Sequence, residues 1–411
     1  MALTLIKNGI LVDGTSDEPN GPIHVLVEGD RIREVSTTPI RNSKARVIDL
    51  VGRTLMPGLI DCHVHVVATT PDFRANAKLP NSIVSARSVK ILNAMLMRGF
   101  TSVRDLGGAD IGLVMAIEEG TIAGPRLIIC GKALSQSGGN CDYRGRFHNR
   151  SVNYYPDRLG ALGRVCDGVS EVRRSVREEI KGGASFIKLM ANGGVSARNN
   201  PIDHFGFSRE EIATAVEEAK SAETYCAAHL YTNEAIARCI ELGVRCVEHG
   251  NFIQPETAAL MKKKGAVSVP TLVTYEALSQ NAAKLDLSSA VVAKIDHLRE
   301  AGLTSLETLN AAGIDMGYGT DLSGYMHSCQ SEEFIIRNRV LPAKSVIASA
   351  THVAALVIRM EGKIGSITPG AYADMIAVEG NPLNELSLLT NQGKHMPLIM
   401  RSGVVFKNTL N

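Results

Sequence analysis

Short apolar segments alternate with amphipathic ones through the middle of the chain, and this alternation restricts the possible folds most. Eight segments have the length and composition of buried strands: Gly58–Val66, Thr101–Asp105, Arg126–Cys130, Ser185–Met190, Tyr225–Leu230, Arg245–His249, Ala266–Pro270 and Ile314–Gly319. Helical patterns lie between them at Ser82–Arg98, Ser170–Lys181, Ser208–Ala222, Asn233–Leu242, Pro255–Lys264 and Leu287–Ala312. This order predicts an α/β fold, a (β/α)8 TIM barrel. An open doubly wound sheet is the alternative, but no G-x-G-x-x-G follows the first strand.

Both ends of the chain instead have short alternating strands, separated by turn dipeptides such as Asp13-Gly14 and Asn20-Gly21. The expected strands are Leu3–Lys7, His24–Glu28, Arg31–Val35, Ala45–Asp49, Lys363–Ile367, Ala373–Glu379 and Leu398–Lys407. We therefore expect two domains in the 411 residues. Residues 1–55 and 363–411 would form a small β-sandwich, and residues 56–362 the barrel.

Charge and composition narrow the class of partner. Lys and Arg number 44 against 42 Asp and Glu, without long runs of one sign, which argues against nucleic acid and anionic membranes. Trp is absent and aromatic residues make up 4%, so a stacking platform for bases or glycans is not expected. A small-molecule substrate fits best.

Cysteine usage and the terminal sequence bear on location. The eight cysteines are scattered singly, without a C-x-x-C pair, as expected of free thiols in a reducing compartment. The first residues do not have the pattern of a signal peptide, and no segment is apolar for the length of a membrane span. We expect a cytoplasmic protein, and a homo-oligomer whose size the sequence leaves open.

Residues able to bind metal gather at the ends of the expected strands, where a barrel carries its active site. His63 and His65 are two apart on the first strand, so their side chains share a face. The others follow along the chain: Lys188 on the fourth strand, His229 on the fifth, His249 on the sixth and Asp321 after the eighth. Each has an ordinary structural explanation, such as a hydrogen-bonded core histidine or a capping aspartate. Their joint position at strand ends favours a metal centre.

In that order, these residues resemble the amidohydrolase superfamily with a binuclear metal centre. The segments LMPGLIDCHVHV, GFTSVRDLGG, KALSQSGG and GKIGSITPGAYADMIAV are most similar to its imidazolonepropionase-related branch. Within that branch, the sequence resembles bacterial Xaa-Pro dipeptidases of the prolidase type. The resemblance covers essentially the whole chain, and a terminal β-sandwich is also a feature of the superfamily.

The resemblance implies a site and a mechanism. His63, His65 and Asp321 would bind one divalent metal ion and His229 and His249 a second, both expected to be Zn²⁺. Lys188 would bridge the two ions as a CO2-derived carbamate. A metal-bridging hydroxide would attack the substrate carbonyl, and Asp321 would carry its proton to the leaving nitrogen.

Substrate contacts are expected in the loops that follow the strands. Tyr231 and Arg144, the latter near Arg146 and His148, are candidates for binding a substrate carboxylate, and His327 follows the eighth strand closely enough to lie at the mouth. The loop after the fourth strand adds three polar candidates, Asn192, Ser196 and Arg198.

Three functions remain open on the sequence. The leading one is a zinc amidohydrolase that cleaves small dipeptides, Xaa-Pro first. A cyclic-amide hydrolase of the imidazolonepropionase type or an N-acyl amino acid hydrolase would use the same ligands. A barrel that has lost catalysis and serves as a scaffold is the remote alternative, because such relatives lack several ligands that are present here.

Overall fold

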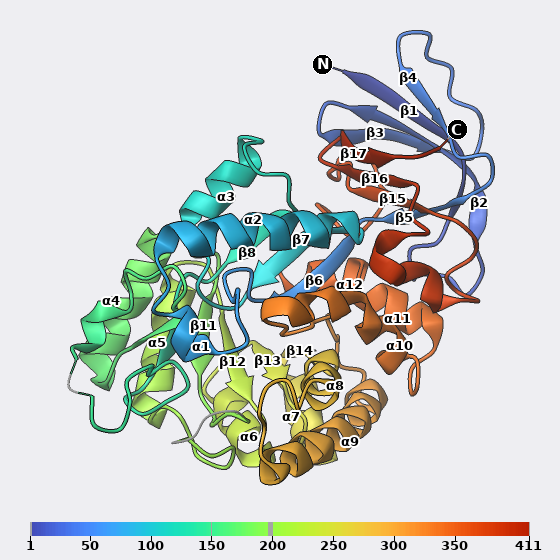
Figure 1. The fold of residues 1–411 in the computed structure, drawn as a ribbon. Helices are drawn as coiled ribbons and strands as arrows, with labels where there is room; N and C mark the ends of the chain where they lie inside the picture. Colours follow the sequence, from blue (N-terminus) through green and yellow to red (C-terminus); the bar gives the residue numbers. More distant parts are fainter. Residues whose placement is uncertain (1, 149, 196–199, 411) are drawn as a thin grey trace.

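The computed structural model describes residues 2–148, 150–195 and 200–410. Its main body is a mixed α/β fold with two parallel sheets and helices outside them (Figure 1). The three-stranded sheet has the order β6-β7-β8, and the six-stranded sheet has the order β10-β9-β11-β12-β13-β14. The strands are β6 Leu59–Val64, β7 Phe100–Asp105, β8 Arg126–Ile129, β9 Ala133–Ser135, β10 Gly163–Val165, β11 Ile187–Met190, β12 Cys226–Leu230, β13 Cys246–His249 and β14 Val267–Val269.

Seven of the eight expected strands are present with small shifts of their ends. The eighth was wrong: Ile314–Gly319 forms only one isolated bridge, between Met316 and Ser268 of β14. Glycines at 317 and 319 favour strand structure weakly, and the Gly317 carbonyl accepts a hydrogen bond from the Arg337 guanidinium instead of a neighbouring strand. Two short strands, β9 and β10, were not predicted.

Single backbone hydrogen bonds connect the two parallel sheets at both sides. Ser185 N donates to Ile129 O at 2.8 Å, next to β8 and β11. On the other side, Gly317 N donates to Ser268 O at 2.9 Å, and Cys62 N of β6 donates to Tyr318 O at 2.7 Å. The segment after α9 (Ser289–Ala311), which contains Gly317 and Tyr318, therefore lies between β14 and β6.

The chain ends form a separate eight-stranded sheet, which stands apart in Figure 1 and contains both termini. Its order is β17-β16-β15-β5-β1-β2-β3, and β4 also pairs with β1. The strands are β1 Leu3–Leu11, β2 Asn20–Glu28, β3 Arg31–Ser36, β4 Arg46–Asp49, β5 Thr54–Pro57, β15 Met375–Val378, β16 Leu398–Arg401 and β17 Val404–Asn408. All these strands thus belong to one hydrogen-bonded sheet, whereas a sandwich of two sheets was expected. The expected strand Lys363–Ile367 is irregular.

All six expected helices are present, and the Ser208–Glu211 capping box opens one of them as predicted. They are α2 Asn81–Met97, α4 Gly168–Lys181, α5 Arg209–Ser221, α6 Asn233–Glu241, α7 Pro255–Lys264 and α9 Ser289–Ala311. The structure adds α1 Phe73–Asn76, α3 Ile111–Glu118, α8 Val273–Gln280, α10 Glu333–Arg337, α11 Ala343–Ser349 and α12 His352–Val357. Across the described residues, none of the helices has both the length and the apolar character of a membrane span.

Candidate metal centre and active site

The six predicted metal-binding residues converge on one cavity. Its volume is about 760 Å³, and all six side chains line it: His63, His65, Lys188, His229, His249 and Asp321. They come from β6 and the residue after it, from β11, β12 and β13, and from the segment after Met316. His249 and Asp321 have positive φ angles, 70° and 51°, which is uncommon outside glycine and often marks a functional site.

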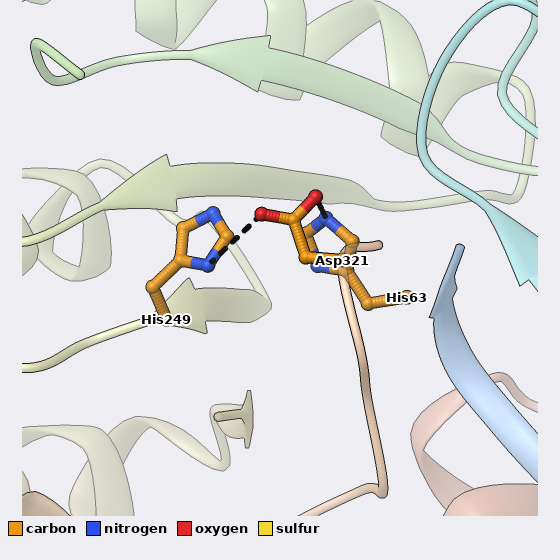
Figure 2. A group of neighbouring side chains, drawn as sticks. All are labelled: His63, His249 and Asp321. Atoms are coloured by element: carbon orange, nitrogen blue, oxygen red, sulfur yellow. Dashed lines mark ion pairs between the residues drawn. The ribbon is translucent and has the colours of Figure 1, made fainter. Parts of the chain in front are cut away.

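The Asp321 carboxylate contacts both His63 of β6 and His65, which directly follows β6. Its Oδ1 lies 3.3 Å from His63 Nε2 and 3.2 Å from His65 Nε2, while Oδ2 lies 4.0 Å from His249 Nδ1. Figure 2 shows the carboxylate between His63 and His249. Ligand atoms of these three residues all lie within 4.8 Å of one another, which is close enough for one ion.

His229 of β12 and His249 of the neighbouring strand β13 face each other directly. His229 Nδ1 lies 2.9 Å from His249 Nε2. His229 Nε2 lies 3.0 Å from the Gly193 carbonyl, which can only accept, so His229 Nδ1 carries the lone pair. His249 Nδ1 lies 2.7 Å from the Thr271 hydroxyl, which can donate or accept. A metal ion that replaced the proton between the two rings would leave every outer hydrogen bond satisfied.

Each of the other two histidines is also held through its outer nitrogen, as is typical of metal ligands. His63 Nδ1 donates to Glu248 Oε2 at 2.8 Å, and His65 Nδ1 lies 3.3 Å from the Gly107 carbonyl. Both contacts leave Nε2 directed at Asp321. The chemistry and orientation of this donor set therefore fit divalent metal ions, with imidazole and carboxylate ligands that suit zinc.

Glu248 and Arg104 were missed by the sequence analysis. Both are fully buried, and Arg104 Nη2 donates to Glu248 Oε1 at 2.7 Å. The signal was a charged residue in the middle of an apolar strand, Arg104 in FTSVRD of β7 and Glu248 in CVEH of β13. Charged residues are buried in this way almost only when paired. Through its hydrogen bond with His63 Nδ1, Glu248 of this pair fixes the orientation of the His63 ring.

Two further buried side chains fix the carbonyls that contact the histidines. Asp105 accepts from Gly107 N at 2.9 Å and from Val66 N at 2.7 Å, and so fixes the turn that carries the Gly107 carbonyl. Asn192 lies two residues after β11. Its side-chain amide donates to the carbonyls of Ile202 and His204, and so fixes the loop that carries the Gly193 carbonyl. Asn192 does not line the cavity, unlike the substrate contact that was predicted.

Burial governs the charge of the site. It lowers the pKa of Lys188, and the negative charges of Glu248 and Asp321 only partly offset it. Burial, with the Lys188 charge, lowers the pKa of His229 to about 3, so that imidazole is neutral. Burial alone would raise the pKa of Asp321, but His63 and His65 outweigh it and hold that pKa well below its usual value. The site thus has neutral imidazoles at His229 and His249, an anionic carboxylate at Asp321 and a lysine whose pKa is shifted toward the neutral form.

The predicted substrate contacts divide into two groups. Tyr231 and Arg144 line the cavity, with Arg146 and His148. Arg144 is already paired with Asp142 at 2.7 Å, and the Tyr275 hydroxyl lies 3.2 Å from that of Tyr231. His327 is buried, contacts the Ala68 carbonyl at 3.2 Å and is not among the described cavity residues. Ser196 and Arg198 lie outside the described residues.

Comparison with known proteins identifies the family. The model of the amidohydrolase family matches residues 54–404, so the chain belongs to this family. A solved structure described as an amidohydrolase is 48% identical over the whole of both chains, with a TM-score of 0.97. A prolidase solved in complex with N-methylphosphonate-L-proline is 44% identical, covering 99% of this chain and 100% of that one, with a TM-score of 0.97. Ochratoxinase from Aspergillus niger is 31% identical over 422 residues, 98% of this chain and 87% of its own length.

These matches confirm the resemblance inferred from the sequence. They also define the class of reaction, because the family and its relatives here are hydrolases. The protein is a hydrolase that acts on amide C–N bonds. The scaffold alternative is therefore set aside.

Proposed function

We propose that the protein is a dipeptidase of the prolidase type that hydrolyses Xaa-Pro dipeptides. It would use two divalent metal ions, for which Zn²⁺ is the first candidate. The observation that carries the proposal is the convergence of all six predicted ligands on one cavity. The 44% identity to a prolidase bound to a phosphonate analogue with a proline portion supports proline on the leaving side.

The proposed architecture is a closed (β/α)8 barrel, residues 56–362, beside a domain from residues 1–55 and 363–411. The hydrogen bonds that join β8 to β11 and β14 to β6 support closure, with Met316–Asp321 in the place of the eighth strand. The terminal sheet supports the second domain. In such a barrel, catalytic groups lie at the carboxyl ends of the strands, and His229 and His249 lie at or next to the ends of β12 and β13.

Bound metal ions would lower the pKa of a water molecule and polarise the scissile carbonyl. The chain's own contribution begins with Lys188. Because burial favours its neutral amine, Nζ can add CO2 and release a proton, which gives a carbamate anion in place of a buried cation. An anion suits a site for two dications better than an ammonium group does.

Asp321 is the proposed proton carrier. Its carboxylate is anionic, since the neighbouring His63 and His65 lower its pKa, and it faces the centre of the cavity. It would accept a proton from the attacking water and deliver it to the amide nitrogen, which cannot leave as an anion. His63 and His65 would hold the carboxylate in this orientation through their Nε2 atoms.

Tyr231 is the first candidate for binding the substrate carboxylate, with Arg144 and His327 as the other proposals. The phenol of Tyr231 can donate to a carboxylate while it accepts from Tyr275. Arg144 could share its guanidinium between Asp142 and a substrate. Unchanged Michaelis constants for dipeptides in Tyr231→Phe would remove Tyr231 from this role.

An N-acyl amino acid hydrolase is the second candidate. The similarity to ochratoxinase covers nearly the whole chain, and a cavity of about 760 Å³ has room for an acyl group larger than an amino acid. A cyclic-amide hydrolase would use the same ligands. All three differ in substrate and share the metal centre.

The test is hydrolysis of a dipeptide library by zinc-loaded protein, beside N-acyl amino acids and imidazolone propionate. Release of amino acids mainly from Xaa-Pro is the expected result. Cleavage of other dipeptides would keep the peptidase and move its specificity, while deacylation or ring opening alone would overturn the dipeptidase proposal. The free state of all eight cysteines supports a reducing, cytoplasmic location, which like the homo-oligomeric state belongs to this proposal.

A further inference from the structure

One buried asparagine connects the strand of Lys188 with the strand of His229. The Asn192 side chain is fully buried and makes hydrogen bonds in two directions. Its Oδ1 accepts from Tyr231 N at 2.8 Å and from Thr232 N at 3.0 Å. Its Nδ2 donates to the carbonyls of Ile202 and His204, each at 2.8 Å. The full hydrogen-bonding capacity of the amide is used inside the protein.

The two sets of bonds act on different parts of the site. The bonds to Tyr231 and Thr232 fix the backbone just after His229. The bonds to residues 202 and 204 hold the return of the loop that begins at Gly193. Gly193 N donates to His204 O at 2.9 Å, and the Gly193 carbonyl is the group that contacts His229 Nε2.

Gly193 packs directly against the returning arm of its loop. A Cβ atom at Gly193 would lie 1.7 Å from the Pro201 carbonyl oxygen, so the two arms of the loop are in close contact. Loss of the bonds to residues 202 and 204 would let this arm shift. Because the arm packs against Gly193 and accepts from Gly193 N, the Gly193 carbonyl would move with it, and the ring orientation of His229 would change. Because that ring directs Nδ1 at His249, its rotation would separate the two facing nitrogens.

The same asparagine is tied to the cavity wall. Asn140 Nδ2 donates to the Asn192 carbonyl at 3.2 Å, and Asn140 Oδ1 accepts from Asn200 Nδ2 at 2.9 Å. Asn140, Asn200 and Tyr231 all line the cavity, whereas Asn192 lies behind it. Parts of the cavity wall thus connect to Asn192 in two ways, Asn140 through the Asn192 backbone carbonyl and Tyr231 through the Asn192 side chain.

We propose that Asn192 is a positioning residue that sets the orientation of both His229 and Tyr231, and so couples one half of the metal centre to the substrate side of the cavity. The inference rests on the proposed metal-dependent function. It assigns no contact with substrate or metal to Asn192 itself. Its effect passes through the Gly193 carbonyl and the backbone of Tyr231.

Two variants separate the two effects. Asn192→Ser removes the bonds in both directions. Asn192→Asp keeps an acceptor for Tyr231 N and Thr232 N but cannot donate to the carbonyls of the loop, so it also guards against a serine variant that fails to fold.

Asn76 provides a matched control. It is fully buried and makes the same pattern of four bonds, accepting from Thr69 N and Oγ1 and donating to the carbonyls of Val67 and Gly160. None of these partners contacts a predicted ligand in the described structure. Asn76→Ser therefore reports what the loss of such an amide costs in stability alone.

The experiment titrates each metal-free protein with Zn²⁺ against a competing chelator, and then measures KM and kcat on the best dipeptide at saturating zinc. In Asn192→Ser we expect one of two zinc ions to bind about 10–100-fold more weakly, and KM to rise. In Asn192→Asp the zinc effect should remain while KM stays close to that of the unaltered protein. Asn76→Ser should lower the melting temperature and leave both zinc ions bound.

The outcomes distinguish this inference from the function on which it rests. If the unaltered protein binds two zinc ions and is active, but Asn192→Ser behaves like Asn76→Ser, the positioning role is wrong and the proposed function stands. Equal losses at both zinc ions in either Asn192 variant would also overturn the role. If the unaltered protein takes up no zinc, both proposals fail.

Discussion

His229 Nδ1 and His249 Nε2 lie 2.9 Å apart, and neither ring is free to turn away. The Gly193 carbonyl holds His229 from the other side, and the Thr271 hydroxyl holds His249. The two nitrogens therefore point at each other across a shared proton, and loss of that proton would direct two lone pairs at one point. This arrangement supports the proposed binding of a metal ion between the two rings.

Removal of metal should destabilise the protein as well as inactivate it. A ligand present at 100 times its dissociation constant stabilises the folded state by about 2.7 kcal/mol. Dialysis against a chelator should therefore lower the melting temperature and abolish amide hydrolysis, and added Zn²⁺ should restore both. Calorimetry with a parallel activity assay measures this. An unchanged melting temperature after proven loss of metal would contradict it.

Glu248→Gln should weaken metal binding without unfolding the protein. The substitution keeps the shape of the side chain but removes the charge that accepts from His63 Nδ1 and pairs with Arg104. Loss of such an outer partner typically costs 10–100-fold in metal affinity or activity. Zinc titration measures the effect, with the exposed Glu210→Gln as the control. Equal zinc affinities in the two variants would show that Glu248 has only a structural role.

Lys188→Ala and Asp321→Asn should each remove most of the activity. Lys188→Ala deletes the proposed bridging ligand, and Asp321→Asn deletes the proton carrier, a role worth roughly 10²–10⁴-fold in rate. The matched controls are the exposed residues in Lys181→Ala and Asp315→Asn, which should leave kcat unchanged. Full activity in either site variant, purified from cells grown with zinc, would rule out the role assigned to that residue.

The strand ends could be predicted because buried parallel strands have a strong signal. His229 in CAAHL and His249 in CVEH each end an apolar run, and the fold brings such ends together. The eighth segment was less predictable: its glycines weaken strand pairing, and the role of Arg337 in binding the Gly317 carbonyl depends on a contact between residues 20 apart in sequence.

The buried residues that support the predicted metal ligands could not be predicted from the pattern of strands. Glu248 and Arg104 are paired across 144 positions, so each alone is only a charge in an apolar strand. The sequence predicts Asn192 as a substrate contact because it lies in a loop after a strand, where polar residues often bind substrate. Only the structure shows that its amide is fully used within the protein.

Arg337→Met should destabilise the protein by about 3–5 kcal/mol, the usual cost of leaving one member of a buried ion pair alone. Arg337 and Glu333 are both fully buried and lie 2.8 Å apart, and Arg337 also donates to the carbonyls of Pro270 and Gly317. The melting temperature should fall in Arg337→Met and recover in part when Glu333→Gln is added, because the second change removes a buried carboxyl that must otherwise stay charged without a partner or take up a proton. A double variant no more stable than Arg337→Met would contradict the ion-pair explanation.

His327 should make the protein less stable in acid. Burial, chiefly, lowers the pKa of this imidazole from 6.5 to about 3. Between these two values the unfolded chain takes up a proton that the folded chain refuses, so the free energy of unfolding falls as the pH falls, by at most about 1.4 kcal/mol per pH unit. His327→Gln keeps a donor for the Ala68 carbonyl but cannot be protonated.

Melting temperatures of the two proteins between about pH 7.5 and 4.5 measure this contribution as a difference, because the other titrating groups are common to both. Glu333 is one of these: burial raises its pKa to about 7, which gives it the opposite slope, with stability lost as the pH rises. The profile of His327→Gln should therefore fall less steeply below pH 6.5 than that of the unaltered protein. Parallel profiles would mean that His327 is protonated in the folded state as readily as in the unfolded one.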